Sequence, residues 1–271
     1  MHVVLIVFCV VLVLFCILLY FVKPNVRRPS DWVSGEFAHR GLHGQGVPEN
    51  SLAAFHAAKE KGLGVELDVQ FTKDGQIIVL HDKNILRMCG VDHMAADLTY
   101  EELCAYPLAG TGEIIPLLKD VLAVLENMPV ICEVKPYAGK VGIPELCRQT
   151  VALFESYPGK VCFESFSPYA VRWFRKNRPE FLRGQLSASA HAGEESLKGY
   201  EAFALRNLFV NLMGRPDFVA FDFKADTFGF WLCRTFFRPL LVAWTARGDT
   251  EREAVPAFYD AVIFEMEAKE G

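Results

Sequence analysis

Residues 64–71, with the sequence GVELDVQF, decide the fold, because they place two carboxylates within an apolar strand. Alternate side chains of a strand point to the same face, so Glu66 and Asp68 share one face. Residues 129–135 (PVICEVK) repeat this pattern with Glu133 and, two residues later, an amine. In a parallel α/β barrel one face of each strand points into the interior, and we expect these charges to lie there.

The stretches around residues 64–71 alternate between strand and helix patterns. GEFAH (35–39) is a short strand before a glycine-rich loop, and Asp74-Gly75 forms the turn to a further strand, QIIVLHD (76–82). Alternation over one domain predicts parallel strands with crossover helices, in a closed barrel or an open doubly wound sheet. Eight strands over about 235 residues favour the α/β class and the (β/α)8 TIM barrel. Further strands are expected at residues 160–166, 181–187, 217–223, 240–245 and 260–265.

Apolar side chains at helical spacing predict helices between the strands. Residues 51–61 form one, with Asn50 or Ser51 as a suitable N-cap. Thr99 and Glu102 fit a capping box and predict a short helix that opens at Thr99. Further helices are expected over residues 117–126, 143–157 and 168–177.

The first 23 residues differ from the rest, because no charge interrupts the run from Val3 to Val22. About 20 residues at 1.5 Å rise span the roughly 30 Å of bilayer hydrocarbon. A secretory signal peptide is the alternative, but only Met1 and His2 precede the run and no small-x-small cleavage site follows it. We therefore expect residues 1–23 to be an uncleaved transmembrane helix in a single-pass protein of the cell membrane.

Charge and cysteine usage bear on the compartment and the partners. The basic residues just after the span, Lys23, Arg27 and Arg28, favour a cytoplasmic catalytic domain. The cysteines beyond the span have no CxxC spacing, as expected of buried thiols in a reducing compartment. Without those three basic residues, 25 basic residues face 33 acidic ones, which argues against a nucleic-acid partner. Residues 24–34 are expected to be a linker, and residues 35–271 one barrel domain.

The charged strand faces predict a metal site. Glu66, Asp68, Glu133 and Lys135 would be costly to bury without partners. A divalent cation offsets that cost, and carboxylate oxygens suit Mg²⁺ or Ca²⁺. The alternative is a solvent-facing strand edge with ordinary surface charge, against which the apolar neighbours argue.

Two histidines add acid–base chemistry. His39 and His81 both stand where a predicted strand ends, which is the catalytic rim of such barrels. Histidine gives and takes protons near neutral pH, so a pair can supply an acid and a base. Arg40 adds a bidentate donor suited to phosphate.

The ordered motifs of the chain resemble those of the glycerophosphodiester phosphodiesterase family. The resemblance runs from Phe37 to Phe264, and the order of the whole set carries it. The motifs are His39-Arg40-Gly41, Pro48-Glu49-Asn50-Ser51, ELDV (66–69), TKDG (72–75), VLHD (79–82), IPL (115–117), EVK (133–135), Ser165-Phe166 and Trp244-Thr245.

The resemblance implies a (β/α)8 barrel that hydrolyses a glycerol-linked phosphodiester to glycerol 3-phosphate and an alcohol. Its substrate would be a small-molecule or lipid-derived phosphodiester, and its cofactor one divalent cation. Phe166 and Trp244 would line the pocket, although ordinary core aromatics are an equal alternative. The implied roles are metal ligands for Glu66, Asp68 and Glu133, acid and base for His39 and His81, and phosphate neutralisation for Arg40 and Lys135.

Some features leave the substrate and the activity open. The chain has Trp244-Thr245-Ala246-Arg247 where the family often has Trp-Thr-Val-Asn, and Glu265 where an aspartate is usual. The aromatic and basic stretch 227–244 fits either a barrel helix with inward-packed aromatics or a segment at the membrane interface. Alternative functions are lysophospholipase D-like hydrolysis, phosphoinositide cleavage, a non-catalytic membrane-tethered binding barrel and an anchored structural protein.

Overall fold

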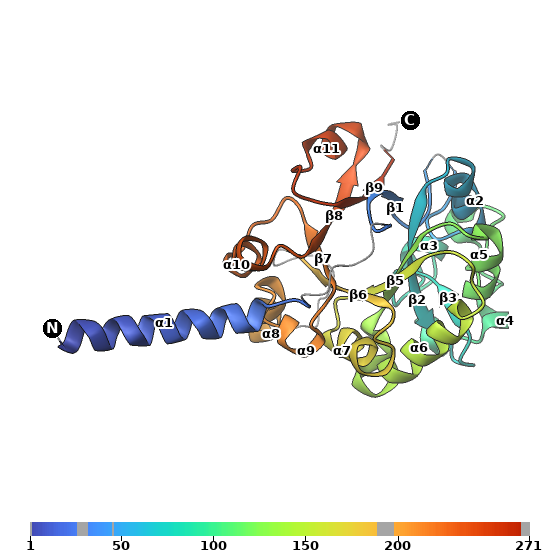
Figure 1. The fold of residues 1–271 in the computed structure, drawn as a ribbon. Helices are drawn as coiled ribbons and strands as arrows, with labels where there is room; N and C mark the ends of the chain where they lie inside the picture. The colour runs from blue at the N-terminus through green and yellow to red at the C-terminus, as the bar shows by residue number, and fades with distance from the viewer. Residues whose placement is uncertain (1, 26–31, 45, 189–197, 267–271) are drawn as a thin grey trace.

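The computed structural model describes residues 2–25, 32–44, 46–188 and 198–266. Its centre is a closed barrel of eight parallel strands, in which β1 pairs with both β2 and β9 (Figure 1). The (β/α)8 barrel expected from the sequence is therefore confirmed. The barrel strands are β1 (Gly35–Ala38), β2 (Gly64–Phe71), β4 (Val130–Val134), β5 (Val161–Ser165), β6 (Leu182–Ser187), β7 (Phe218–Asp222), β8 (Leu240–Arg247) and β9 (Ala261–Glu265).

One predicted strand lies outside the barrel. Residues 76–82 contribute only β3 (Ile77–Val79), which pairs antiparallel with β2 beyond the point where β2 pairs with β4. The Asp74-Gly75 turn is too short for the crossover that a parallel strand needs, so the chain folds back as a hairpin. The prediction that His81 follows a barrel strand was therefore wrong.

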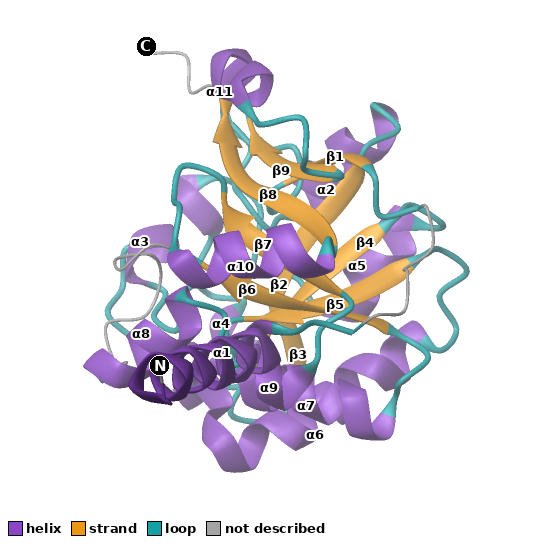
Figure 2. Ribbon diagram, turned by 60° about the vertical axis from the view of Figure 1, so that its left-hand side comes forward, coloured by secondary structure: helices purple, strands orange, loops and turns teal. Residues whose placement is uncertain are grey.

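Helices enclose the barrel (Figure 2). The predicted capping box is present: Thr99 Oγ1 accepts from the Glu102 amide at 3.3 Å, and a Glu102 carboxylate oxygen accepts from the Thr99 amide at 2.8 Å. Ser51 is the N-cap of its helix and accepts from the Ala54 amide at 3.1 Å. The helices are α2 (Leu52–Glu60), α3 (Leu86–Cys89), α4 (Tyr100–Leu103), α5 (Leu118–Leu125), α6 (Gly139–Phe154), α7 (Pro168–Asn177), α8 (Gly199–Arg206), α9 (Asn211–Gly214), α10 (Phe228–Phe237) and α11 (Gly248–Ala254), with short 3-10 turns at Ala95–Asp97, Leu108–Gly110 and Pro136–Ala138.

The barrel interior is apolar towards the amino ends of the strands. Phe37 and Phe218 are fully or almost fully buried there, in one cluster with Ile131. Glycines on the adjacent strands make room for the two rings: a Cβ on Gly64 would lie 2.6 Å from the Phe37 ring, and one on Gly184 would lie 2.2 Å from the Phe218 ring. Ile131 shares its face of β4 with Glu133, so the same interior becomes charged further along the strands.

The N-terminal helix α1 (His2–Val22) projects from the barrel, with its last turns against α9 and α10 (Figure 1). Within the described residues it is the one helix long and apolar enough to cross a membrane, judged by length and composition. The predicted linker 24–34 is only partly described, because residues 26–31 lie outside the described residues. Its described ends pack on the barrel: the Asn25 amide donates to the Pro216 carbonyl at 2.8 Å, and Val33 is 1% exposed in the interior cluster.

Candidate active site

Three carboxylates meet inside the barrel. Glu66 and Asp68 point from one face of β2, and Glu133 stands beside Asp68 on β4. Side-chain oxygens of the three residues lie within 4.8 Å of one another, and the residues are 2%, 0% and 5% exposed. Burial and the charges of Asp68 and Glu133 raise the pKa of Glu66 well above its usual value.

The carboxylate group fits a divalent cation. Burial, only partly opposed by the Lys135 ammonium, raises the pKa of Glu133 to about 7. Among the described residues, Glu133 Oε1 is buried with no hydrogen-bond partner. A buried polar atom without a partner is costly, and a hard cation with oxygen ligands would remove that cost. The metal role of the three residues stays a prediction.

Lys135 supplies positive charge to the same cluster. Its Nζ lies 2.9 Å from Glu133 Oε2 and 3.1 Å from Asp68 Oδ1, and its side chain is 3% exposed. Burial opposes the ammonium charge, but Asp68 and Glu133 more than offset it and raise the pKa of Lys135. Burial also disfavours ionisation of Asp68, yet Lys135, His81 and Arg40 hold its pKa well below the usual range.

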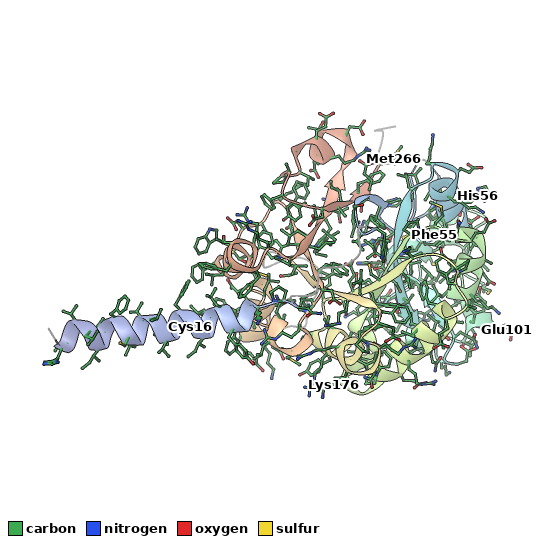
Figure 3. All side chains as sticks on the ribbon, in the orientation of Figure 1. Cys16, Phe55, His56, Glu101, Lys176 and Met266 are labelled. Atoms are coloured by element: carbon green, nitrogen blue, oxygen red, sulfur yellow. The ribbon has the colours of Figure 1, made fainter. Side chains whose placement is uncertain are left out.

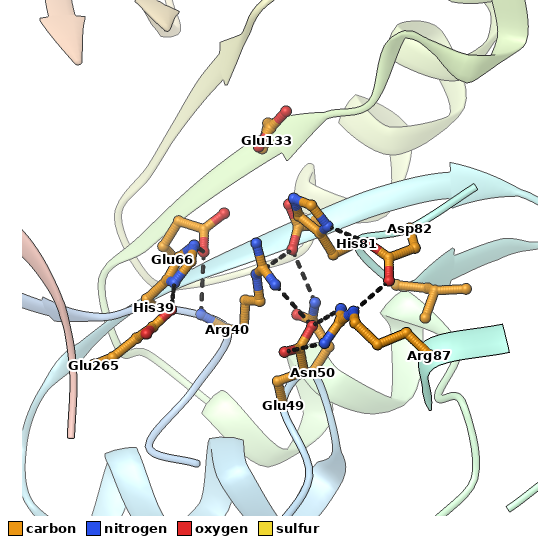
Figure 4. Close-up of polar contacts among 12 residues, drawn as sticks. His39, Arg40, Glu49, Asn50, Glu66, His81, Asp82, Arg87, Glu133 and Glu265 are labelled. Carbon is orange, nitrogen blue, oxygen red and sulfur yellow. Dashed lines mark hydrogen bonds and ion pairs between the residues drawn. The ribbon is translucent and has the colours of Figure 1, made fainter. Parts of the chain in front are cut away.

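His39 follows β1 and reaches the carboxylates from one side (Figure 4). Its Nδ1 lies 2.6 Å from Glu265 Oε1, and its Nε2 lies 3.8 Å from Glu66 Oε2. Because an ionised carboxylate only accepts, Nδ1 carries the proton and Nε2 keeps its lone pair. Burial, assisted by the Arg40 charge, lowers the pKa of His39 to about 4, so the imidazole is neutral at pH 7.

His81 lies two residues beyond β3. Its backbone is held by contacts from β2 and from the turn that follows β4. Gln70, on the charged face of β2, donates to the carbonyls of Leu80 and Asp82 at 2.7 and 2.8 Å. The Tyr137 hydroxyl donates to the His81 carbonyl at 3.0 Å. His81 Nδ1 lies 2.7 Å from Asp82 Oδ1, so this histidine too directs a bare Nε2 away from its carboxylate. Burial and Lys135 lower the pKa of His81.

Arg40 sits in a tight loop after β1. Both Arg40 and Gly41 have left-handed backbone angles, with φ of 55° and 78°. The Arg40 amide donates to Glu66 Oε2 at 3.1 Å, and its guanidinium contacts Glu49 at 2.8 Å and Asp68 at 3.5 Å. The side-chain amide of Asn50 donates to Asp68 Oδ2 at 2.8 Å. The loop thus ties Arg40 to two of the proposed metal ligands.

Phe166 and Trp244 are brought together as well. Their rings make an edge contact with centroids 5.5 Å apart, one just after β5 and the other on β8. Trp244 Nε1 is buried and has no hydrogen-bond partner among the described residues. An indole N–H that can donate to a ligand fits a pocket wall, and the core and pocket interpretations both remain.

Several residues of the site were not assigned from the sequence. Glu265 had been noted as a departure from the family, whereas the structure shows that it holds His39. Glu49 bridges Arg40 and Arg87, and Arg87 also pairs with Asp82 at 2.6 Å. Glu164 stands beside Glu133 in the register of β5 and is 2% exposed. Glu164, like Glu133, is the second-last residue of its strand, and this position was the sequence feature that could have indicated its place near the site.

Known proteins are similar to this chain in sequence and in fold. A human lysophospholipase D is 35% identical over 131 residues, which are 44% of this chain and 41% of that protein. A glycerophosphodiester phosphodiesterase of Caldanaerobacter subterraneus is 32% identical over 158 residues, which are 55% of this chain and 65% of that protein. The alignments thus span less than two thirds of the length of each of these relatives.

The structural comparison covers more of the barrel. A phosphodiesterase of Oleispira antarctica, solved with its product sn-glycerol-3-phosphate, superposes with a TM-score of 0.70 at 21% identity and covers 86% of this chain and 93% of its own. This likeness concerns the fold. The sequence model of the glycerophosphoryl diester phosphodiesterase family matches residues 39–213, more than half of the chain, from His39 through Glu133 and beyond. The resemblance found in the motifs is confirmed, and the chain belongs to the glycerophosphoryl diester phosphodiesterase family.

Proposed function

We propose that the protein hydrolyses glycerophosphodiesters to glycerol 3-phosphate and an alcohol, using one divalent cation, Mg²⁺ or Ca²⁺. The observation that carries the proposal is the trio of buried carboxylates, with oxygens within 4.8 Å, beside two carboxylate-bound histidines. Glu66, Asp68 and Glu133 hold the cation. When bound, it withdraws electron density from the phosphoryl oxygens.

The remaining side chains handle the protons and the phosphate charge. One histidine accepts the proton of the attacking hydroxyl or water through its Nε2, and the other, once its Nε2 has taken up a proton, delivers that proton to the leaving alkoxide. Glu265 and Asp82 hold the two imidazoles in the required tautomer through Nδ1. Arg40 and Lys135 balance charge on the phosphoryl oxygens.

A hydrolysis assay tests this proposal. The full chain, in detergent, is treated with EDTA and then supplied with Mg²⁺ or Ca²⁺ in the presence of glycerophosphocholine or glycerophosphoethanolamine. We expect release of glycerol 3-phosphate with one of the ions and none with EDTA. The Glu133→Gln variant, which loses a charged ligand, is expected to need more metal for its residual rate. Absence of hydrolysis with every ion would refute the catalytic proposal and favour the binding barrel.

Lysophospholipase D activity is a second candidate, favoured by the apolar helix α1 and by the likeness to a human lysophospholipase D. The same assay with lysophosphatidylcholine distinguishes the two, because choline release from this lipid without release from glycerophosphocholine would assign the lipid substrate. Phosphoinositide cleavage would instead release an inositol phosphate.

We also infer that α1 crosses the cell membrane once, with the barrel on the cytoplasmic side. The helix is 21 residues long, and an 18-residue window within it has a mean hydropathy of 3.5. Protection of the barrel from protease added outside intact cells, and its loss on lysis, is the expected result. Digestion in intact cells would reverse the orientation.

A further inference from the structure

The helix α1 has two parts in different surroundings. Residues 2–14 are exposed on all sides, whereas from Phe15 onward the helix packs on the barrel (Figure 3). The Phe15 and Phe236 ring centroids are 5.5 Å apart, those of Phe21 and Phe209 are 6.0 Å apart, and Val22 is fully buried. The last turns of α1 are therefore part of the barrel's own surface.

The free part of α1 is too short to cross a bilayer. Residues 2–14 rise about 20 Å, against roughly 30 Å of hydrocarbon. If α1 spans the membrane, about 10 Å of its packed part lies inside the hydrocarbon too. The surface of the barrel that surrounds those turns must then lie at the same depth.

That surface is aromatic. Five side chains on α8 and α10 point outward beside the base of α1, and we call them the aromatic collar. Figure 1 shows both helices next to α1. Phe209, just after α8, contacts Phe203 at 5.8 Å and Phe21 of α1 at 6.0 Å. On α10, Phe236 contacts Trp231 at 6.3 Å and Phe15 of α1 at 5.5 Å. The collar consists of Tyr200 (67% exposed), Phe203 (58%), Phe228 (55%), Trp231 (41%) and Phe236 (48%).

The barrel does not need these side chains for its own core. On α10, Phe230, Leu232 and Cys233 face inward and are at most 2% exposed, so the inward face satisfies the packing predicted for stretch 227–244. The α10 residues of the collar lie on the exposed face of the same helix. The inward packing expected for this stretch is confirmed, and the interpretation as a segment at the membrane interface stays a prediction that concerns the exposed face.

Polar groups mark where the apolar surface ends. The Arg215 guanidinium donates to the carbonyls of Tyr20 and Lys23 at 2.8 and 2.7 Å, at the C-terminal end of α1. Arginine and lysine at a helix end are typical of the headgroup level, and the positive charge also favours the C-terminus of the helix dipole. The collar residue Phe236 contacts α1 at Phe15, five residues nearer the N-terminus than Tyr20, and this contact therefore lies on the hydrocarbon side of that level.

We propose that the aromatic collar is immersed in one leaflet of the membrane. The side of the barrel that carries α8 and α10 then lies within the bilayer, and the barrel is not merely tethered to the membrane surface by α1. The proposal rests on the membrane-spanning role proposed for α1. The lipid is the occupant that continuity indicates, because aromatic contacts join the collar to α1: Phe236 contacts Phe15 of α1, and Phe203 contacts Phe209, which contacts Phe21 of α1. The N-terminus of α10 follows β7 by five residues, at the strand end where the catalytic group lies, so the immersed side reaches the rim of the site.

Quenching by brominated lipid tests the collar in the full-length chain. The chain has four tryptophans, and Trp231 is the one in the collar. The wild-type chain, Trp231→Phe and Trp173→Phe are reconstituted in phosphatidylcholine nanodiscs with or without bromine on the acyl chains. Trp173 is a matched control, since it packs on α7 against a core cluster that contains no α1 residue. Both substitutions keep an apolar ring, so the fold is retained.

We expect the wild-type protein to lose about a quarter of its fluorescence to bromine, because Trp231 is one of four tryptophans, and Trp173→Phe to lose about a third, because Trp231 is then one of three; Trp231→Phe should lack this quenched component. Equal quenching of all three proteins would overturn the collar but leave the anchor. Discs that contain two copies with Trp231 unquenched would overturn it in favour of a dimer. Failure to enter nanodiscs would overturn anchor and collar together, while hydrolysis of glycerophosphocholine by the same samples reports separately on catalysis.

Discussion

His39 and His81 reach the site as neutral imidazoles whose orientation is set by Glu265 and Asp82. In each pair the carboxylate accepts a hydrogen bond from the Nδ1–H group, and burial keeps the ring uncharged at neutral pH. Both residues are thus oriented for proton transfer by a carboxylate. The partner of His39 lies far away in the sequence, whereas the partner of His81 is the next residue. At this scale the chemistry depends on tautomers as much as on residue identity.

The acid–base roles predict the effect of removing either ring. His39→Asn and His81→Asn are each expected to lower kcat on glycerophosphocholine by at least about 100-fold, the typical contribution of a positioned acid or base. The matched control is His56→Asn on α2, a 62% exposed side chain outside the site. Steady-state rates at saturating metal measure the effect. A rate near that of the control in either variant would remove that histidine from the mechanism.

The buried state of His39 predicts how stability varies with pH in metal-free protein. Its folded pKa is about 4 against 6.5 in the unfolded chain, so between these values the unfolded state binds a proton that the folded state does not. The free energy of unfolding should fall by about 3 kcal/mol as the pH drops from 6.5 to 4. The low pKa of Glu265 acts in the same direction at still lower pH, because its carboxylate must be protonated.

Denaturant titrations with EDTA at pH 7 and pH 4.5 measure this effect. His39→Asn should show a smaller loss between the two pH values than the wild-type chain, since its side chain does not titrate. An identical pH dependence in the two proteins would show that His39 has the same pKa in the folded and unfolded states.

The loop between β1 and α2 positions Arg40 through its backbone. Gly41 has φ of 78°, and a Cβ there would lie 2.9 Å from the Ala54 backbone at the start of α2. Only glycine lets the loop close this tightly against the helix. The Arg40 amide is thereby held on Glu66, so an element boundary determines part of the site.

Gly41→Ala is therefore expected to lower the free energy of unfolding by about 2 kcal/mol or more, from backbone strain and overpacking. It should also reduce hydrolysis, because Arg40 and Glu66 move apart. Gly112→Ala is the control: Gly112 has no left-handed angle and open space around its Cβ position. Denaturant unfolding measures the stability of the two variants. Equal stabilities would contradict the close approach of Gly41 to the Ala54 backbone.

At the scale of the whole molecule, α1 is both a candidate membrane span and a packed helix of the barrel. Asn211 is fully buried and donates to the Val22 carbonyl at 2.9 Å, and the Asn25 side chain donates to Asp217 at 2.6 Å. Truncation of α1 therefore has a structural limit. A deletion through residue 30 would expose a face of α9 and α10.

Deleting residues 2–14 should leave the barrel folded, because each of these residues is exposed. Deleting residues 2–25 should destabilise it by about 3 kcal/mol, from the lost burial of Val22 and the unpaired Asn211 amide. Denaturant unfolding of both truncated chains in detergent measures the difference. Equal stability of the two would show that the packed turns of α1 contribute nothing.

The sequence by itself determined the local features of this protein. The strand patterns located the eight barrel strands to within one or two residues, together with residues 76–82 outside the barrel. The alternation placed Glu66 and Asp68 on one face of β2, because side-chain alternation is a property of the strand alone, whereas the meeting with Glu133 depends on the register of β4. The motif order identified the family. The capping box at Thr99 and the N-cap at Ser51 were also readable, since each depends on residues three positions apart.

Tertiary structure decided which of these features meet. That β3 leaves the barrel depends on the hairpin turn and on β4 taking its place beside β2. The contact of Glu265 with His39 exists because β9 closes the barrel next to β1, across 226 positions of sequence. The placement of the collar next to α1 arises in the same way, when the last turns of α1 dock against α9 and α10. Strand register and barrel closure join segments that no local pattern relates, so these parts of the site and the surface required the folded chain.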